Sequence, residues 1–238
     1  SGKIGIKIYS PAGNEVFSTS QDVLLSEETP VATSFSIKKP ELWSVDTPVL
    51  YTAEVSLFSN EKEYDKITVP FGIRTLSFSA DKGFLLNGKP VKLKGGCIHH
   101  DNGLLGAVAI DRAEERKVEL MKANGYNAVR CSHNQVSEHF LDACDRLGML
   151  VIHETFDQWQ AAKREQDYHQ FFDEWSDRDL SASVRRDRNH PSIIMWSIGN
   201  EVAQRADEPE GDLISKRLVG TIRKYDTSRF TTIGSNDF

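Results

Sequence analysis

The sequence predicts two regions of different fold class: an incomplete antiparallel β-sandwich over residues 1–75, and an α/β region over residues 76–238. The first region alternates apolar and polar residues with period two and shows no helical stripe, which is typical of sandwich strands. The second alternates helical segments with short, almost wholly apolar strands, which indicates a parallel sheet buried on both faces. Polar residues follow each of these strands, as in a (β/α)8 barrel. An open doubly wound sheet fits the same periodicity nearly as well.

Four stretches of the first region are expected to be strands: Lys3–Ser10, Val31–Ile37, Val49–Phe58 and Tyr64–Ile73. A turn at Pro11-Ala12-Gly13-Asn14 follows the first of them. Four or five strands are few for a sandwich, so we expect one edge of the fold to be missing.

The second region begins with an expected hairpin around Asn87-Gly88, a pair that favours two-residue β-turns. Asp111 is expected to cap a helix that ends at Gly125, with Glu114 completing a capping box. Further helices are expected at Ser137–Leu147, around Trp175, Leu180 and Val184, and at Leu213–Tyr225. The expected strands are Val91–Gly95, Asn127–Ser132, Met149–Glu154, Ile193–Gly199 and Phe230–Ser235. Five strands are three fewer than a closed barrel needs, so either the sheet is open or the sequence stops early.

The composition excludes several classes of partner. Lys and Arg number 29 against 35 Asp and Glu, giving a net charge of −6, which argues against nucleic acid or an anionic membrane. No apolar run approaches the roughly 18 residues of a membrane span, and the first residues lack the pattern of a signal peptide. The cysteines Cys97, Cys131 and Cys144 are widely spaced and are expected to be small buried thiols, not disulfides or zinc ligands.

Polar side chains gather just beyond the strands of the second region. In a barrel they would meet at one mouth, and carboxylates, amides, imidazoles and indoles are the groups that a sugar site uses. The polar side chains at the five strand ends, in chain order, are Cys97, His99, His100, Asp101 and Asn102; Arg130, Ser132, His133 and Asn134; His153, Glu154, Asp157 and Trp159; Ser197, Asn200 and Glu201; and Ser235 and Asn236.

Each of these residues also has a structural interpretation. Glu201 could be a carboxylate at a helix N-terminus, Glu154 an ion-pair partner of Arg130, and Trp159 a core residue. His99 and His100 could bind a metal, but adjacent side chains on an extended chain point in opposite directions. A nicotinamide enzyme has little support, because no glycine-rich G-x-G-x-x-G fingerprint follows the first strand.

Two stretches resemble the signatures of glycoside hydrolase family 2, the family of β-galactosidases, β-glucuronidases and β-mannosidases. They are NAVRCSHNQVSEHFLDACDRLGMLVI (Asn127–Ile152) and DRNHPSIIMWSIGNE (Asp187–Glu201). Pro40–Phe58 with Phe71–Arg74 is similar to the end of that family's immunoglobulin-like domain, and Phe84–Asp101 to its first barrel strand. The resemblance implies an incomplete immunoglobulin-like β-sandwich followed by the first five or so strands of a TIM barrel, as an internal fragment of a longer protein.

The resemblance also implies a function: part of a retaining exo-β-glycosidase that hydrolyses terminal β-linked sugars, with β-galactosidase favoured. A β-glucuronidase or β-mannosidase is the alternative within the family, and a non-catalytic carbohydrate-binding or structural module is the alternative of another class. Glu201 matches the family's general acid/base, and Asn200 the residue that holds the sugar's 2-hydroxyl. His99, Arg130 and His133 match positions that line the pocket. Glu154, Asp157 and Trp159 are added to this substrate-binding set because they follow the third strand.

A retaining glycosidase needs two carboxyl groups about 5–5.5 Å apart. The family's nucleophile is a glutamate on the seventh strand, so we expect it outside this chain and expect the 238 residues alone to be inactive. Some family members bind magnesium through a Glu and a His after strand three, where this chain has Gln158 and Gln160, so no cofactor or metal is expected. Asn134-Gln135 and Cys97 also depart from the family pattern, which usually has Tyr-Pro and often Asn there.

Three further expectations concern the surroundings of the chain. The partner is expected to be a β-glycoside or oligosaccharide, with no nucleic acid and no membrane. An unpaired apolar edge at the fifth strand is expected to recruit a second copy, giving a homo-oligomer. Resemblance to polysaccharide-degrading bacterial relatives favours the periplasm or secretion over the cytoplasm.

Overall fold

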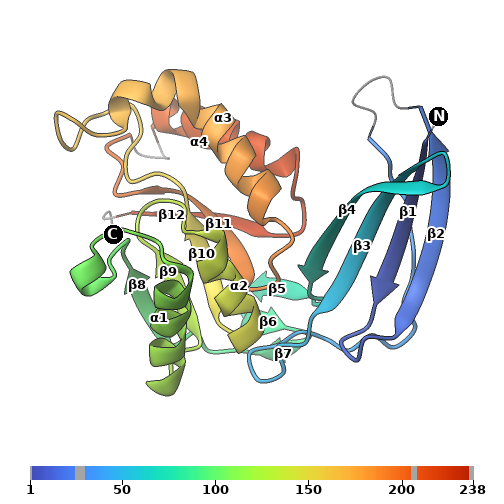
Figure 1. The fold of residues 1–238 in the computed structure, drawn as a ribbon. Coiled ribbons are helices and arrows are strands. Elements are labelled where there is room, and N and C mark those ends of the chain that lie inside the picture. The colour runs from blue at the N-terminus through green and yellow to red at the C-terminus, as the bar shows by residue number, and fades with distance from the viewer. Residues whose placement is uncertain (1, 25–29, 205–207, 236–238) are drawn as a thin grey trace.

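The structure is a computed structural model that describes residues 2–24, 30–204 and 208–235. Figure 1 shows a four-stranded antiparallel sheet standing beside a helix-covered five-stranded sheet, with a small three-stranded sheet between them. No helix within these described ranges is long and apolar enough to cross a membrane. The chain therefore has the two regions that the sequence predicts, a partial sandwich and a partial barrel.

The antiparallel sheet has the order β2-β1-β3-β4 and consists of β1 (Gly2–Tyr9), β2 (Glu15–Val23), β3 (Tyr51–Ser59) and β4 (Lys62–Phe71). Three of the four predicted strands are confirmed. The strand predicted at Val31–Ile37 is wrong: residues 30–37 have no regular structure, and Phe35 stacks on Phe17 of β2 at 5.0 Å. Strand β2 was missed because most of its side chains are exposed, so it carries little alternation.

The small sheet consists of β5 (Leu76–Ser79), β6 (Gly83–Leu86) and β7 (Lys89–Pro90). The predicted hairpin turn is confirmed, since both Asn87 and Gly88 have the positive φ angles that this kind of turn requires. Phe84 and Leu86 pack in one cluster with the first residues of the parallel strands and with Trp43. The hairpin therefore closes the amino end of the partial barrel.

The parallel sheet has the order β12-β11-β10-β9-β8, and every neighbouring pair is parallel. Its strands are β8 (Gly95–Ile98), β9 (Ala128–Cys131), β10 (Leu150–Glu154), β11 (Ile193–Asn200) and β12 (Phe230–Gly234). All five predicted strands are present. The first begins four residues later than predicted, because Val91 and Leu93 pack against the hairpin cluster instead.

Among the described residues, four α-helices accompany the parallel strands: α1 (Asp111–Ala123), α2 (Glu138–Leu147), α3 (His169–Asp187) and α4 (Pro209–Arg223), with a short 3-10 helix, η1 (Gly103–Leu105). The cap predicted for α1 is off by one residue: Ile110 is the N-cap, and the carboxylate of Asp111 faces His139 at 3.1 Å. The α2 boundaries follow the sequence, since Ser137 accepts a hydrogen bond from the Phe140 amide and Gly148 is left-handed.

Contacts at the amino end of the barrel join the two regions. The Arg74 guanidinium donates to the carbonyls of Pro191 and Ile193, and the Trp43 indole donates to the carbonyl of Asp145 at 2.8 Å. Trp43 has no exposed surface. The carboxyl ends of the strands point away from this junction.

Candidate active site

The candidate site lies at the carboxyl ends of β9, β10 and β11. Parallel pairing in register places Arg130 beside Ile152 and Glu154 beside Ser197. The last residue of β11, Asn200, reaches the same place. Three adjacent strands therefore deliver their polar side chains to one edge of the sheet, as the sequence predicts for a barrel mouth.

Glu154 is the buried centre of this cluster, with 0 % of its side chain exposed. Arg130 donates to both of its oxygens, from Nε at 3.0 Å and from Nη2 at 2.8 and 2.9 Å. His133 contacts it through Nδ1 at 2.7 Å, and Ser197 donates to it at 2.6 Å. A buried carboxylate is tolerated only when it is paired and hydrogen-bonded, and Glu154 is both. The ion pair between Glu154 and Arg130 is thus confirmed, and no surface of the Glu154 side chain is exposed to solvent.

Asn200 is buried, and its amide is held at both ends. Its Oδ1 accepts from Arg130 Nη2 at 2.7 Å, and its Nδ2 donates to Asp157 Oδ1 at 2.9 Å. Lys163 donates to Asp157 Oδ1 at 2.8 Å and to the Asn200 carbonyl at 2.7 Å. Although burial raises the pKa of Asp157, the hydrogen bonds from Lys163 and Asn200 keep it below its usual value. Asp157 is therefore an anionic acceptor that orients the amide.

Glu201 follows directly, and its side chain is exposed. Its backbone adopts a positive φ of 48°, which is uncommon for a residue with a side chain, and its amide donates to the Gly234 carbonyl of β12 at 2.8 Å. The chain turns sharply here, which leaves the Glu201 carboxyl group at the open end of the strands. The interpretation of Glu201 as a helix N-terminal carboxylate is wrong, because the next helix begins only at Pro209.

Two histidines and a cysteine lie beside this cluster. The rings of His99 and His133 meet edge to face with their centroids 5.4 Å apart. His100 instead bonds to the Gln135 carbonyl, so the adjacent histidines do not share a ligand. Cys97 is exposed, with its sulfur 3.8 Å from Arg130 Nη1, so the expectation of a buried thiol is wrong for this residue; Cys131 and Cys144 are buried.

Trp159 is not placed to stack on a sugar. Its side chain has no exposed surface, and its indole donates to the Ile198 carbonyl of β11 at 2.8 Å. The polar residues around it in the sequence suggested a surface loop, but the indole folds back beneath Gly199. Trp159 supports the end of β11, and its prediction as a substrate platform is corrected.

The structure also adds two residues to the predicted set. Ser197 stands at a predicted strand end outside the predicted binding set, and its hydroxyl donates to the Glu154 carboxylate. Lys163 lies in an irregular polar loop, where no periodic pattern could have shown that it reaches Asn200. Asn236 lies outside the described residues.

The positions that correspond to a magnesium site in some relatives do not fit that ion. Gln158 is buried, and the Gln160 amide donates to Asp173 at 2.7 Å. Neutral amides replace the carboxylate and imidazole that would hold the cation, so no chemical step is assigned to magnesium here.

Comparisons with known proteins match one and the same family in both regions of the chain. The profile of "Glycosyl hydrolases family 2, TIM barrel domain" matches residues 79–237, and that of "Glycosyl hydrolases family 2" matches residues 1–74. The β-galactosidase BoGH2A of Bacteroides ovatus is 39 % identical over 94 % of this chain and 30 % of its own length. A β-glucuronidase of Bacteroides fragilis is 32 % identical over 84 % of this chain and 29 % of its own length.

Among solved structures, a glycosyl hydrolase family 2 member from Bacteroides cellulosilyticus is 48 % identical, with a TM-score of 0.94 over 100 % of this chain and 31 % of its own. The chain therefore spans about a third or less of the length of the relatives that it matches.

Proposed function

The chain belongs to glycoside hydrolase family 2, and on this premise we propose that it forms part of the catalytic site of a retaining exo-β-glycosidase that acts on terminal β-galactosides. The observation that carries the proposal is the Asn200-Glu201 pair at the end of β11. The Asn200 amide is fixed at both ends, and the next side chain is left exposed at the mouth.

Glu201 is the general acid/base of the proposed reaction. As an acid it protonates the glycosidic oxygen when the aglycone leaves, and as a carboxylate it then takes a proton from the attacking water. The second carboxyl group, the nucleophile, would come from outside these residues. Glu154 does not suit that role, because its oxygens are buried and already accept hydrogen bonds from Arg130, His133 and Ser197.

The hydrogen-bonding capacity that remains at the mouth suits sugar hydroxyls. Asn200 Nδ2 has two hydrogens and donates one to Asp157; the other has no acceptor among the described residues and is proposed to bond to the 2-hydroxyl. His133 contacts Glu154 through Nδ1, so its other ring nitrogen, Nε2, is proposed to bond to a sugar hydroxyl. His99 and Arg130 complete the wall of this proposed pocket.

The galactoside assignment is supported by the names of relatives. Relatives named β-galactosidase are 31–39 % identical to the chain, and relatives named β-glucuronidase or putative β-glucuronidase are 32–36 % identical, so the assignment follows the first of these relatives, BoGH2A, at 39 %. A panel of p-nitrophenyl β-galactoside, β-glucuronide and β-mannoside tests it on the whole protein, and we expect the highest kcat/KM for the galactoside. Faster glucuronide or mannoside turnover would make the sugar assignment wrong without affecting the role of Glu201.

The same panel separates an enzyme from a non-catalytic carbohydrate-binding or structural module. With an alkyl β-galactoside added to the panel as an unactivated substrate, we expect Glu201→Gln to abolish its turnover, whereas Glu210→Gln, a matched change on the exposed start of α4, keeps it. A whole protein that hydrolyses none of the three glycosides would favour the non-catalytic module.

A further inference from the structure

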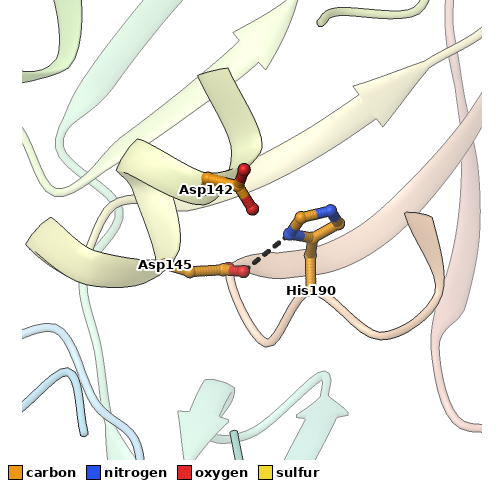
Figure 2. Close-up of side chains that lie close together, drawn as sticks. All are labelled: Asp142, Asp145 and His190. Carbon is orange, nitrogen blue, oxygen red and sulfur yellow. Dashed lines mark hydrogen bonds and ion pairs between the residues drawn. The ribbon is translucent and has the colours of Figure 1, made fainter. Parts of the chain in front are cut away.

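We propose that Asp142, Asp145 and His190 form a binding site for a divalent transition-metal ion at the amino end of the barrel, away from the candidate active site. One carboxylate oxygen from each aspartate and one ring nitrogen of His190 lie within 4.8 Å of one another. Figure 2 shows the imidazole facing both carboxylates. The site borders the junction with the antiparallel sheet, where the Asp145 carbonyl accepts from the Trp43 indole.

The local structure explains why these three groups converge. Asp142 and Asp145 are three residues apart on α2, so their side chains leave the same face of the helix. His190 stands in the short turn between α3 and β11 and points back at that face. Only 4 % of the Asp145 side chain and 12 % of the His190 side chain are exposed, so the groups are held in place by packing.

The donor set fits the proposed ion. Two carboxylate oxygens and an imidazole nitrogen are ligands that zinc and manganese accept, and three protein ligands leave positions for water. The Ser192 amide, which is not one of the proposed ligands, orients Asp145 by donating to its Oδ1 at 3.0 Å, and Asp145 Oδ2 contacts His190 Nδ1 at 2.6 Å. Within the described part of the chain, no hydrogen bond to the Asp142 carboxylate is found, which leaves its oxygens available to a cation.

A metal would also have a route to the site. A cavity of about 480 Å³ opens between α1, α2 and the antiparallel sheet, and Asp142 and Asp145 line it. Two arginines, Arg112 and Arg146, also line it, and both are paired with Glu115. The ion would replace the proton that His190 shares with Asp145 and would add Asp142 as a third ligand, with water from the cavity completing its shell.

The expected consequence is structural. The ion would tie α2 to the segment before β11, and both pack against the junction between the two regions. Because it would bind the folded chain and not the unfolded one, a concentration about 100 times its Kd should raise Tm by a few °C. Catalysis at the opposite end of the strands should change little.

The test compares zinc and manganese binding by equilibrium dialysis with elemental analysis, together with Tm, on the untagged whole protein. Asp142→Asn removes one ligand without breaking a described hydrogen bond, and Asp111→Asn is the matched control in the same cavity. We expect the wild type and Asp111→Asn to bind one more ion per chain than Asp142→Asn, and only those two to gain Tm. Equal binding and equal Tm shifts in all three proteins, or no binding of either ion by the wild type, would overturn the proposal.

Discussion

Glu154 offers the sharpest test of how the candidate site is held together. Glu154→Gln keeps the shape of the side chain but removes its charge and turns one acceptor oxygen into a donor amide. Arg130, His133 and Ser197 all direct hydrogens at that carboxylate, so at least one donor would face another donor. The substitution therefore disrupts the cluster without creating a cavity.

The size of the effect follows from burial. Removing one partner of a buried ion pair costs about 3–5 kcal/mol, and because Arg130 is 27 % exposed and keeps some access to water, we expect a loss near the lower value, about 3 kcal/mol. Asn200 would lose its fixed position because Arg130 also holds its Oδ1 at 2.7 Å. A displacement of about 1 Å in a positioning group can cost about 100-fold in rate, so kcat/KM should fall by about that factor.

Urea unfolding and steady-state kinetics of the whole protein with p-nitrophenyl glycosides measure both effects. Ser197→Ala serves as the control, because it removes one hydrogen bond to Glu154 and leaves the ion pair intact; we expect it to cost about 1 kcal/mol and less than 10-fold in rate. If Glu154→Gln unfolds within about 0.5 kcal/mol of the wild type and keeps kcat/KM within about threefold, the positioning role is refuted.

Three further substitutions test separate contacts. Trp159→Phe removes the indole donor to a buried main-chain carbonyl and should cost about 1–3 kcal/mol in urea unfolding, and an unchanged midpoint would contradict the supporting role. Gly234→Ala places a methyl group against the Arg130 guanidinium and should lower kcat/KM at least 10-fold; normal kinetics would show that Arg130 can move freely. Burial raises the pKa of Asp226, but Arg229 and neighbouring hydrogen bonds hold it at about 2, so its stabilisation of about 2 kcal/mol is present above pH 4 and lost as the pH falls toward 2. Asp226→Asn should therefore flatten the acid-unfolding profile between pH 4 and 2, and an unaltered profile would exclude this contribution.

The parts of the fold that the sequence predicts best are those whose pattern reports burial directly. The strand Ile193–Asn200 is almost entirely buried and reads as an apolar run, and Ser137 and Gly148 mark α2 through the chemistry of helix ends. The exposed strand Glu15–Val23 gives no such signal, because its place is set by pairing with β1 and not by burial.

In the candidate site, too, the sequence predicts some features and misses others. Strand ends predict which side chains share the mouth, since parallel strands present their carboxyl ends together. Strand position does not tell which of these side chains is exposed: Glu154 ends the strand that Asp157 and Trp159 follow, yet Glu154 and Trp159 are both fully buried. Lys163 could not be predicted, because an irregular loop brings it to Asn200 through contacts with no sequence period.

The proposed role of Glu201 as the general acid/base is tested most directly by measuring how turnover by the Glu201→Ala protein depends on the leaving group. Loss of a general acid matters for a poor leaving group and little for a good one, so the whole protein should lose about 10²–10⁴-fold in kcat/KM with an alkyl β-galactoside and far less with 2,4-dinitrophenyl β-galactoside. Added azide should speed turnover of the activated substrate and yield the β-glycosyl azide, because azide needs no general base. Equal losses on both substrates with no azide product, or full activity on the alkyl glycoside, would contradict the role of Glu201.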